Sequence, residues 1–227
     1  MTRHLLRAAL GAALLVLPAA AQNCAPHWST DFGLPGIVGS QPEVNAFEVF
    51  DDGTGESLYV GGLFTQAGGA AAMNIARWRG NVWTPVGVGL PGRVRALFVH
   101  NDGTGPALYA GGDFSGGVMR WNGVSWSALA TGVNGPVYTL GSYDDGMGEA
   151  LFAGGQFTIA GGVSAVNIAR WKFGGWSGLG TGLNGTVRAL AVFVSGGVLE
   201  LVAGGEFITS GTSSLQRVAL LNGSTLS

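Results

Sequence analysis

The sequence predicts an all-β protein built from repeats, on two observations. A phrase that begins with Leu and ends with Gly-Gly-X-Phe occurs four times, at Leu58–Phe64, Leu108–Phe114, Leu151–Phe157 and Leu201–Phe207. The doublets start at positions 61, 111, 154 and 204, so they are 50, 43 and 50 residues apart. A period near 50 with glycine doublets is typical of β-propeller blades. We therefore expect four four-stranded blades, at about residues 44–92, 93–135, 136–185 and 186–227.

The first 21 residues have the pattern of a secretory signal peptide. Arg3 and Arg7 give a basic start, residues 8–17 are apolar, and small residues end the segment at Ala21. The apolar run is too short to span a bilayer. We expect residues 1–21 to be removed, residues 22–227 to form the propeller domain, and the protein to be secreted, either extracellular or periplasmic. No transmembrane segment is expected after that removal.

Composition narrows the possible partners. The 11 Lys and Arg residues, two of them in the leader, are outnumbered by 13 Asp and Glu residues. No basic patch remains, which argues against nucleic acid as a partner. Cys24 is the only cysteine, so no intrachain disulfide can form. It is either a free thiol or, with a poor match to the pattern, a lipidation site.

The second repeat shows most clearly how a blade is built. Residues 94–99, 107–114, 118–121 and 125–129 are β-prone runs, and they are separated by turn residues such as Asn122-Gly123. Four such strands joined by hairpins form one antiparallel sheet. The glycine doublet is expected where a neighbouring backbone or ring approaches closely.

Six of the seven tryptophans form pairs five residues apart, at Trp78/Trp83, Trp121/Trp126 and Trp171/Trp176. They are either packing residues between blades or a platform for stacking sugars, and we favour packing because a scaffold contact recurs at the same repeat position. An arginine precedes the first Trp of each pair, at Arg77, Arg120 and Arg170. These arginines are expected to stack on a neighbouring ring or to lie on the solvent face.

The two ends of the chain match each other. Residues 27–36 read as an orphan fourth strand and its exit, similar to residues 83–92, whereas the fourth repeat stops at Ser227 with its last strand barely begun. Either the N-terminal strand closes a four-bladed ring, which would remove an exposed sheet edge, or the chain is an open fragment of a larger propeller. The sequence leaves both possibilities open.

The doublet followed by a tryptophan pair resembles kelch-type repeats, the propeller of galactose oxidase and its relatives. The fuller phrase, Ala67-Gly68-Gly69, then Asn74–Trp78 and Trp83, looks close to secreted bacterial kelch-like proteins and is similar to the fungal cortical cell-polarity marker family. The resemblance covers roughly residues 27–227. It implies the fold more than the activity, because such propellers serve as enzymes, adhesins and scaffolds.

The copper chemistry of galactose oxidase is not expected here. It needs Tyr and His ligands and a cysteine cross-linked to a tyrosine, but after residue 21 only His27 and His100 remain, and Cys24 lies outside the repeats. No nucleophile–base–orienter set is evident either. Glu48 and Glu206 are possible general acids only in the sense that any carboxylate can serve as one. We expect no catalytic residues, no bound metal and no cofactor.

Three repeats carry an acidic turn, at Asp51–Glu56, Asn101–Gly105 and Asp144–Glu149. Oxygen-rich loops with glycine suit calcium, but Asp-Gly is also a common hairpin turn. The spacing does not follow that of an EF-hand loop, and the fourth repeat replaces the segment with Ser195-Gly196-Gly197. The structural interpretation is therefore favoured.

One set of positions predicts a ligand site. The first strand of each repeat is expected to be innermost, and its second position carries Asn45, Arg95, Tyr138 or Arg188. These four residues would surround one mouth of a central channel, where the two arginines could bind a carboxylate or sulfate. Alternatively they are ordinary polar residues at the start of a strand.

These observations favour a non-catalytic binding or structural module at the cell surface or outside the cell, with a protein or glycan ligand. The alternative is a carbohydrate-active or oxidase-type enzyme domain.

Overall fold

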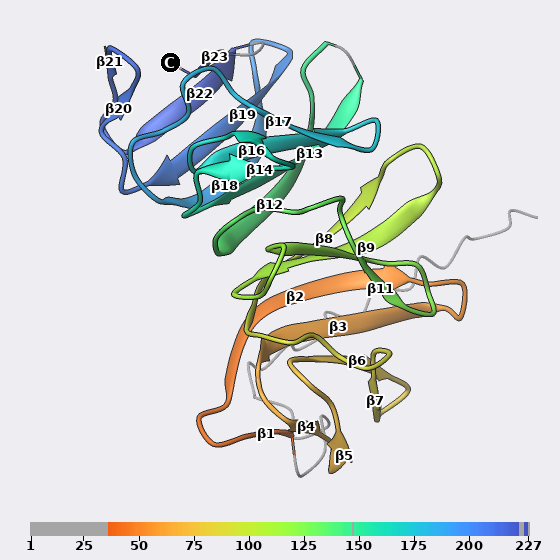
Figure 1. Ribbon diagram of the computed structural model, residues 1–227. Helices are drawn as coiled ribbons and strands as arrows, with labels where there is room; N and C mark the ends of the chain where they lie inside the picture. Colours follow the sequence, from red (N-terminus) through yellow and green to blue (C-terminus); the bar gives the residue numbers. More distant parts are fainter. Residues whose placement is uncertain (1–35, 147, 223–224, 227) are drawn as a thin grey trace, which may run out of the picture. The chain divides into compact units, whose positions relative to one another are not determined.

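The structure, a computed structural model, describes residues 36–226 except 147, 223 and 224. This part of the chain contains only strands, turns and irregular segments, with no helix, and therefore no helix that could cross a membrane. Most strands belong to four antiparallel sheets of four strands each (Figure 1). The predicted all-β class is confirmed.

In each four-stranded sheet the strands lie side by side in chain order and are joined by short connections. The first sheet is formed by β2 (Glu43–Asp51), β3 (Glu56–Leu63), β6 (Ile75–Arg79) and β7 (Val82–Pro85). The second is formed by β8 (Val94–Asn101), β9 (Pro106–Gly112), β10 (Val118–Trp121) and β11 (Trp126–Ala128). The third is formed by β12 (Val137–Asp144), β13 (Glu149–Gly155), β16 (Ile168–Lys172) and β17 (Gly175–Gly178). The fourth is formed by β18 (Val187–Ser195), β19 (Val198–Gly205), β22 (Val218–Asn222) and β23 (Thr225–Leu226).

Short hairpins are inserted between the second and third strands of three sheets. They consist of β4 (Gln66–Ala67) with β5 (Ala70–Ala71), β14 (Ile159–Ala160) with β15 (Val163–Ser164), and β20 (Thr209–Ser210) with β21 (Ser213–Ser214). A further strand, β1 (Ile37–Val38), pairs with β4. The second repeat lacks this hairpin, which explains why its period is 43 residues.

The strand predictions for the second repeat agree closely with the structure. Residues 118–121 form β10 as predicted, and the other three strands begin and end within two residues of their predicted bounds. Phe114 was expected inside a strand, but β9 ends at Gly112. In two other repeats the strand also ends before this Phe, where a buried asparagine takes up its N–H: Asn74 Oδ1 accepts a hydrogen bond from Phe64 N (3.1 Å), and Asn167 Oδ1 accepts one from Phe157 N (3.2 Å).

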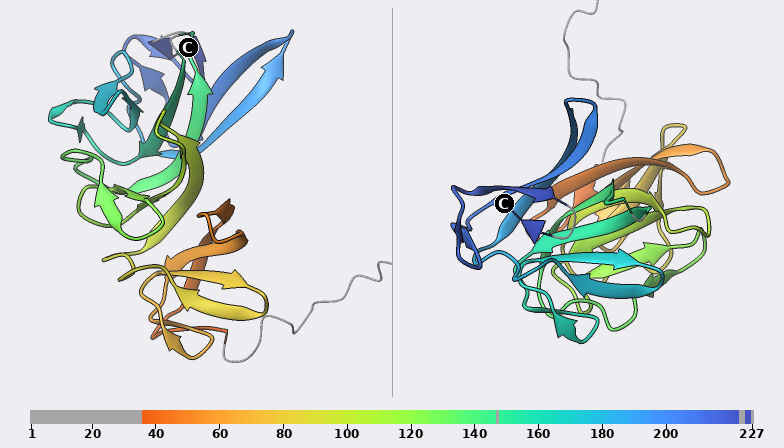
Figure 2. Two further views of the ribbon diagram at one scale, coloured as in Figure 1. Left: turned by 90° about the vertical axis from the view of Figure 1, so that its right-hand side faces the viewer. Right: turned by 90° about the horizontal axis from the view of Figure 1, so that it is seen from above.

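Successive sheets pack through their first strands, since β2 contacts β8, β8 contacts β12, and β12 contacts β18 (Figure 1 and Figure 2). The glycine doublets make this packing possible. A Cβ on Gly111 would lie 2.7 Å from Val137 Cγ1 of the next sheet, and a Cβ on Gly112 would lie against the carbonyl oxygen of Arg93, which directly precedes the neighbouring strand β8. The predicted close approach at the doublet is therefore present on both of its faces.

Two of the three tryptophan pairs, Trp121/Trp126 and Trp171/Trp176, contribute to packing between sheets as predicted, whereas Trp83 packs against residues of its own repeat. The two indoles of each pair lie opposite each other on adjacent strands, with centroids 5.1–5.3 Å apart. Trp126 Nε1 donates to the Val86 carbonyl (3.2 Å) and Trp176 Nε1 donates to the Leu129 carbonyl (3.0 Å), and both acceptors belong to the preceding repeat. Trp121, Trp171 and Trp176 are buried in the cores that join neighbouring sheets.

The predicted signal peptide and almost all of the predicted orphan strand, residues 27–36, lie outside the described residues. Within the described part, β23 pairs with β22 as the fourth strand of the last sheet.

Candidate binding cluster at the strand bulges

The four residues of the predicted ring occupy equivalent positions in the four sheets. The register between the first two strands shifts between Val44 and Ala46, and the same shift recurs after Val94, Val137 and Val187. The extra residue at each shift is Asn45, Arg95, Tyr138 or Arg188. A β-bulge redirects the side chain of its extra residue. The same kind of bulge therefore sets the direction of all four side chains. The repeat pattern of the sequence identifies these positions but does not reveal the bulges.

Three of the four residues form one cluster. The guanidinium carbon of Arg95 lies 4.9 Å from the ring centroid of Tyr138, and that of Arg188 lies 4.5 Å from the same centroid. Both distances are within the range of cation–π attraction. Asn45 has a different contact, because its Nδ2 donates to the carbonyl of Val94 (3.1 Å).

Both arginines of the cluster are paired with carboxylates. Arg95 donates from Nε and Nη2 to the two oxygens of Asp113 (2.6 and 2.7 Å), and Arg188 donates from the same two nitrogens to one oxygen of Glu206 (3.0 and 2.7 Å). These hydrogen bonds raise the pKa of Arg95 and lower the pKa of Glu206. An anionic ligand would therefore compete with carboxylates that the protein already supplies. This competition argues against the predicted binding of a carboxylate or sulfate by the two arginines.

The sequence contained a signal for these pairs that the analysis missed. Asp113 and Glu206 are the variable residues of the Gly-Gly-X-Phe phrase in the second and fourth repeats, the same two repeats that carry Arg at the bulge. In the first and third repeats both positions are uncharged, with Asn45 and Leu63 in one and Tyr138 and Gln156 in the other. The bulge position and the variable position of the phrase are thus either both charged, with opposite signs, or both uncharged. This correlation between repeats indicates that the two positions are in contact.

A cleft of about 560 Å³ borders the cluster. Arg95, Asp113 and Tyr138 line it together with the apolar side chains of Phe114, Val133 and Pro136. A mixed lining of this kind, with few charges and an aromatic ring at the edge, suits a ligand that has both polar and apolar groups. A similar cleft of about 470 Å³ occurs at the next sheet boundary, lined by residues that include Phe157 and Asn184.

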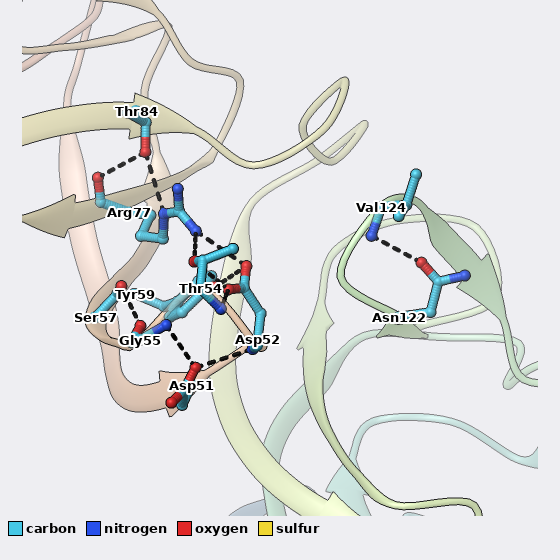
Figure 3. Close-up of polar contacts among 11 residues, drawn as sticks. Asp51, Asp52, Thr54, Gly55, Ser57, Tyr59, Arg77, Thr84, Asn122 and Val124 are labelled. Carbon is cyan, nitrogen blue, oxygen red and sulfur yellow. Dashed lines mark hydrogen bonds and ion pairs between the residues drawn. The ribbon is translucent and has the colours of Figure 1, made fainter.

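The acidic turns are held by hydrogen bonds within the chain. Asp51 Oδ1 accepts from the backbone N–H groups of Gly53 (2.9 Å) and Gly55 (2.7 Å). Asp52 Oδ1 accepts from the hydroxyl of Thr54 (2.6 Å), while Asp52 Oδ2 accepts from the hydroxyl of Tyr59 (2.8 Å) (Figure 3). These contacts support the structural interpretation of the turns. The described residues contain no group of three or more His, Cys, Asp or Glu side chains placed to hold a metal ion.

The arginine that precedes each tryptophan pair has a role that the sequence analysis did not predict. Arg77 Nη1 donates to Asp52 Oδ2 (3.0 Å) and to the hydroxyl of Thr54 (2.9 Å), so it ties the turn to the third strand (Figure 3). The corresponding ion pairs join Arg120 to Asp102 (3.4 Å) and Arg170 to Asp145. These arginines are therefore scaffold residues, although sequence spacing suggested ring stacking or a solvent position.

The hydrogen bonds and charges around these turns shift the pKa values of the Asp and Tyr side chains. Burial by itself would raise the pKa of Asp52, but the hydrogen bonds from Thr54 and Tyr59 and the charge of Arg77 outweigh it, so this pKa is lowered. Burial, together with the nearby Asp102 carboxylate, raises the pKa of Tyr109 to about 12. Because the folded pKa of Asp52 is depressed, its contribution to stability is present above the unfolded value of about 4 and is lost as the pH falls through the folded value.

Asp52→Asn is expected to lower the free energy of unfolding by about 1–2 kcal/mol at pH 7, because the side chain of Asp52 is only 5% exposed and accepts charge-assisted hydrogen bonds. Equilibrium denaturation at several pH values measures this loss, which should shrink as the pH falls below about 4. Glu56→Gln, at an exposed position at the end of the same turn, is the control. An equal loss at pH 3 and pH 7 would contradict the assigned role of the charge.

One buried histidine lies in a polar chain that the sequence did not reveal. His100 Nδ1 lies 3.0 Å from Ser142 Oγ, and the Ser142 hydroxyl donates to Glu149 Oε1 (2.6 Å). Burial lowers the pKa of His100. In a nucleophile–base–orienter set the imidazole stands between the hydroxyl and the carboxylate, whereas here the serine stands between the other two. The arrangement does not match that set.

No family model matches the sequence, and a search of curated proteins finds no relative. The kelch-like resemblance therefore remains a prediction.

Proposed function

We propose that this chain is a secreted β-propeller of kelch-like type that acts as a non-catalytic binding module. The proposal of a propeller is supported by four similar sheets whose first strands contact one another in sequence. The proposal of secretion rests on the signal-peptide pattern of residues 1–21.

The observation that carries the proposed binding role is the cluster of Arg95, Tyr138 and Arg188 beside the larger cleft. Several polar side chains of the sheets hold the scaffold together. Arg77 and Asp52, for example, hold a turn. The cluster arginines are also paired, with Asp113 and Glu206, but the cluster places an aromatic ring and two guanidinium groups at bulges, where side chains are redirected from the strand. A glycan or a protein segment, with polar groups and apolar faces, fits this lining.

A glycan array probed with the purified protein, together with turnover and bound-copper measurements, tests this proposal. Binding without turnover and without stoichiometric copper supports it. Turnover, or copper bound in stoichiometric amount, would instead favour an oxidase-type or carbohydrate-active enzyme.

For a ligand found in this way, Tyr138→Ala is expected to weaken binding about tenfold or more, because truncation of a central aromatic contact residue commonly has an effect of this size. Isothermal titration calorimetry measures the change. Phe173→Ala, which removes an exposed aromatic ring in the turn between β16 and β17, is the matched control. Equal affinity of the Tyr138→Ala variant and the unaltered protein would place the ligand elsewhere.

A further inference from the structure

The three interfaces between successive sheets follow one rule. A valine at the start of one first strand inserts its side chain beside the first glycine of the preceding doublet, in the pairs Gly61/Val94, Gly111/Val137 and Gly154/Val187. A Cβ on Gly154 would lie 2.5 Å from Val187 Cγ1, and the Gly61 pair is closer still. All three valines are completely buried. Each interface thus consists of a glycine notch on one sheet and a valine on the next.

The last sheet has the notch, but no valine of the described residues fills it. A Cβ on Gly204 would lie 4.0 Å from its nearest neighbour among the described residues, the carbonyl oxygen of Arg217, which directly precedes β22. The cross-strand pairs Ala189/Gly204, Ala191/Val202 and Phe193/Glu200 share this face. Phe193 is 43% exposed, whereas Tyr143 at the equivalent place in the third sheet is buried. We call this surface the notch face.

The first sheet has the valine, but within the described part of the chain no glycine notch receives it. Val44 is 39% exposed, and Phe47 and Val49 on the same face are 63% and 58% exposed. In the second sheet the equivalent residues Val94 and Leu97 are buried against the first sheet. We call this surface the valine face.

The segment that precedes the first sheet makes the same contacts as the segment that connects the second sheet to the third. Gly68 N donates to the carbonyl of Gly36 (2.9 Å), as Gly161 N donates to the carbonyl of Gly132 (2.7 Å) at the boundary between the second and third sheets. Ile37 is paired with Ala67 just as Val133 is bridged to Ala160. The first sheet therefore has, before its first strand, the contacts that are found where one sheet follows another.

We propose that the valine face of one copy of this chain docks on the notch face of a second copy, with Val44 inserted at Gly204. The interface would repeat the contact that the chain already makes three times. Among the described residues both faces are exposed at once, so neither covers the other within one chain, and a second copy carries the complement of each face. The contact is heterologous, which generates rings or open chains of copies.

Sedimentation equilibrium over a range of protein concentrations tests the proposal. The average mass is expected to rise above that of the monomer, and Val44→Asp and Gly204→Val are each expected to abolish the rise. Gly204→Val has room in the monomer, so its unfolding curve should match that of the unaltered protein. Val88→Asp, at a position 91% exposed, is the control and should still associate. A constant monomer mass at all concentrations would overturn the proposal.

Disulfide cross-linking distinguishes two copies from closure within one chain. In a Cys24→Ser background, a Val44→Cys chain mixed with a Gly204→Cys chain should give a linked dimer, and a Val88→Cys chain mixed with the same partner should not. The double variant Val44→Cys/Gly204→Cys at high dilution should remain reduced. An internal disulfide in that variant, formed without dimers, would show that the chain closes on itself and would refute docking between copies.

Discussion

Trp121→Ala is expected to lower the free energy of unfolding by about 3–5 kcal/mol, the usual loss when a buried Trp or Phe is truncated. Trp121 is buried in a core that also contains Phe50 of the first sheet, and its ring lies beside Gly87, where a Cβ would be 2.8 Å from Trp121 Cζ3. The indole thus fills the boundary between the first and second sheets. Equilibrium denaturation with urea measures the loss.

The matched control for this prediction is Trp78→Ala. Trp78 has the equivalent position in the first sheet, but its side chain is only partly buried. A smaller loss is therefore expected. A loss below about 1 kcal/mol for Trp121→Ala would contradict the packing role and favour an exposed stacking platform.

Gly111→Val is expected to lower the free energy of unfolding by about 3 kcal/mol, at the upper end of the effect of overpacking a core. A side chain at this position would collide with Val137 Cγ1, which a Cβ would approach to 2.7 Å. The third sheet would have to move away from the second, so the core that contains Val137 and Leu140 would open. Thermal and urea unfolding measure the loss.

Gly204→Val makes the same chemical change in the same phrase of the fourth repeat, where the nearest atom to a Cβ is 4.0 Å away. Little change in the stability of the monomer is expected from it. Equal losses for the two variants would mean that strand propensity, rather than packing between sheets, decides the effect, since both glycines lie in equivalent strands.

Turn chemistry explains why strand positions could be predicted from the sequence. In the second repeat, the hairpin signal at Asn122-Gly123 and the glycines after Phe114 are local, and they mark strand ends whatever the rest of the fold does. The strand 118–121 was therefore predicted at its observed bounds. The hydrogen bond that Phe64 N donates to Asn74, just after the end of β3, could not be predicted from such local signals, because Asn74 lies ten residues away.

The sequence by itself determined the fold class, the number of repeats and the equivalence of Asn45, Arg95, Tyr138 and Arg188, because periodicity and turn residues are properties of the chain alone. Only the tertiary structure decided which groups meet. It paired Arg95 with Asp113 and Arg188 with Glu206, and it brought both guanidinium groups to Tyr138. Among residues 36–226, with their gaps, it also left Val44 and Gly204 without the partners that their equivalents have. Such contacts depend on how whole sheets pack, and packing joins residues that no local pattern relates.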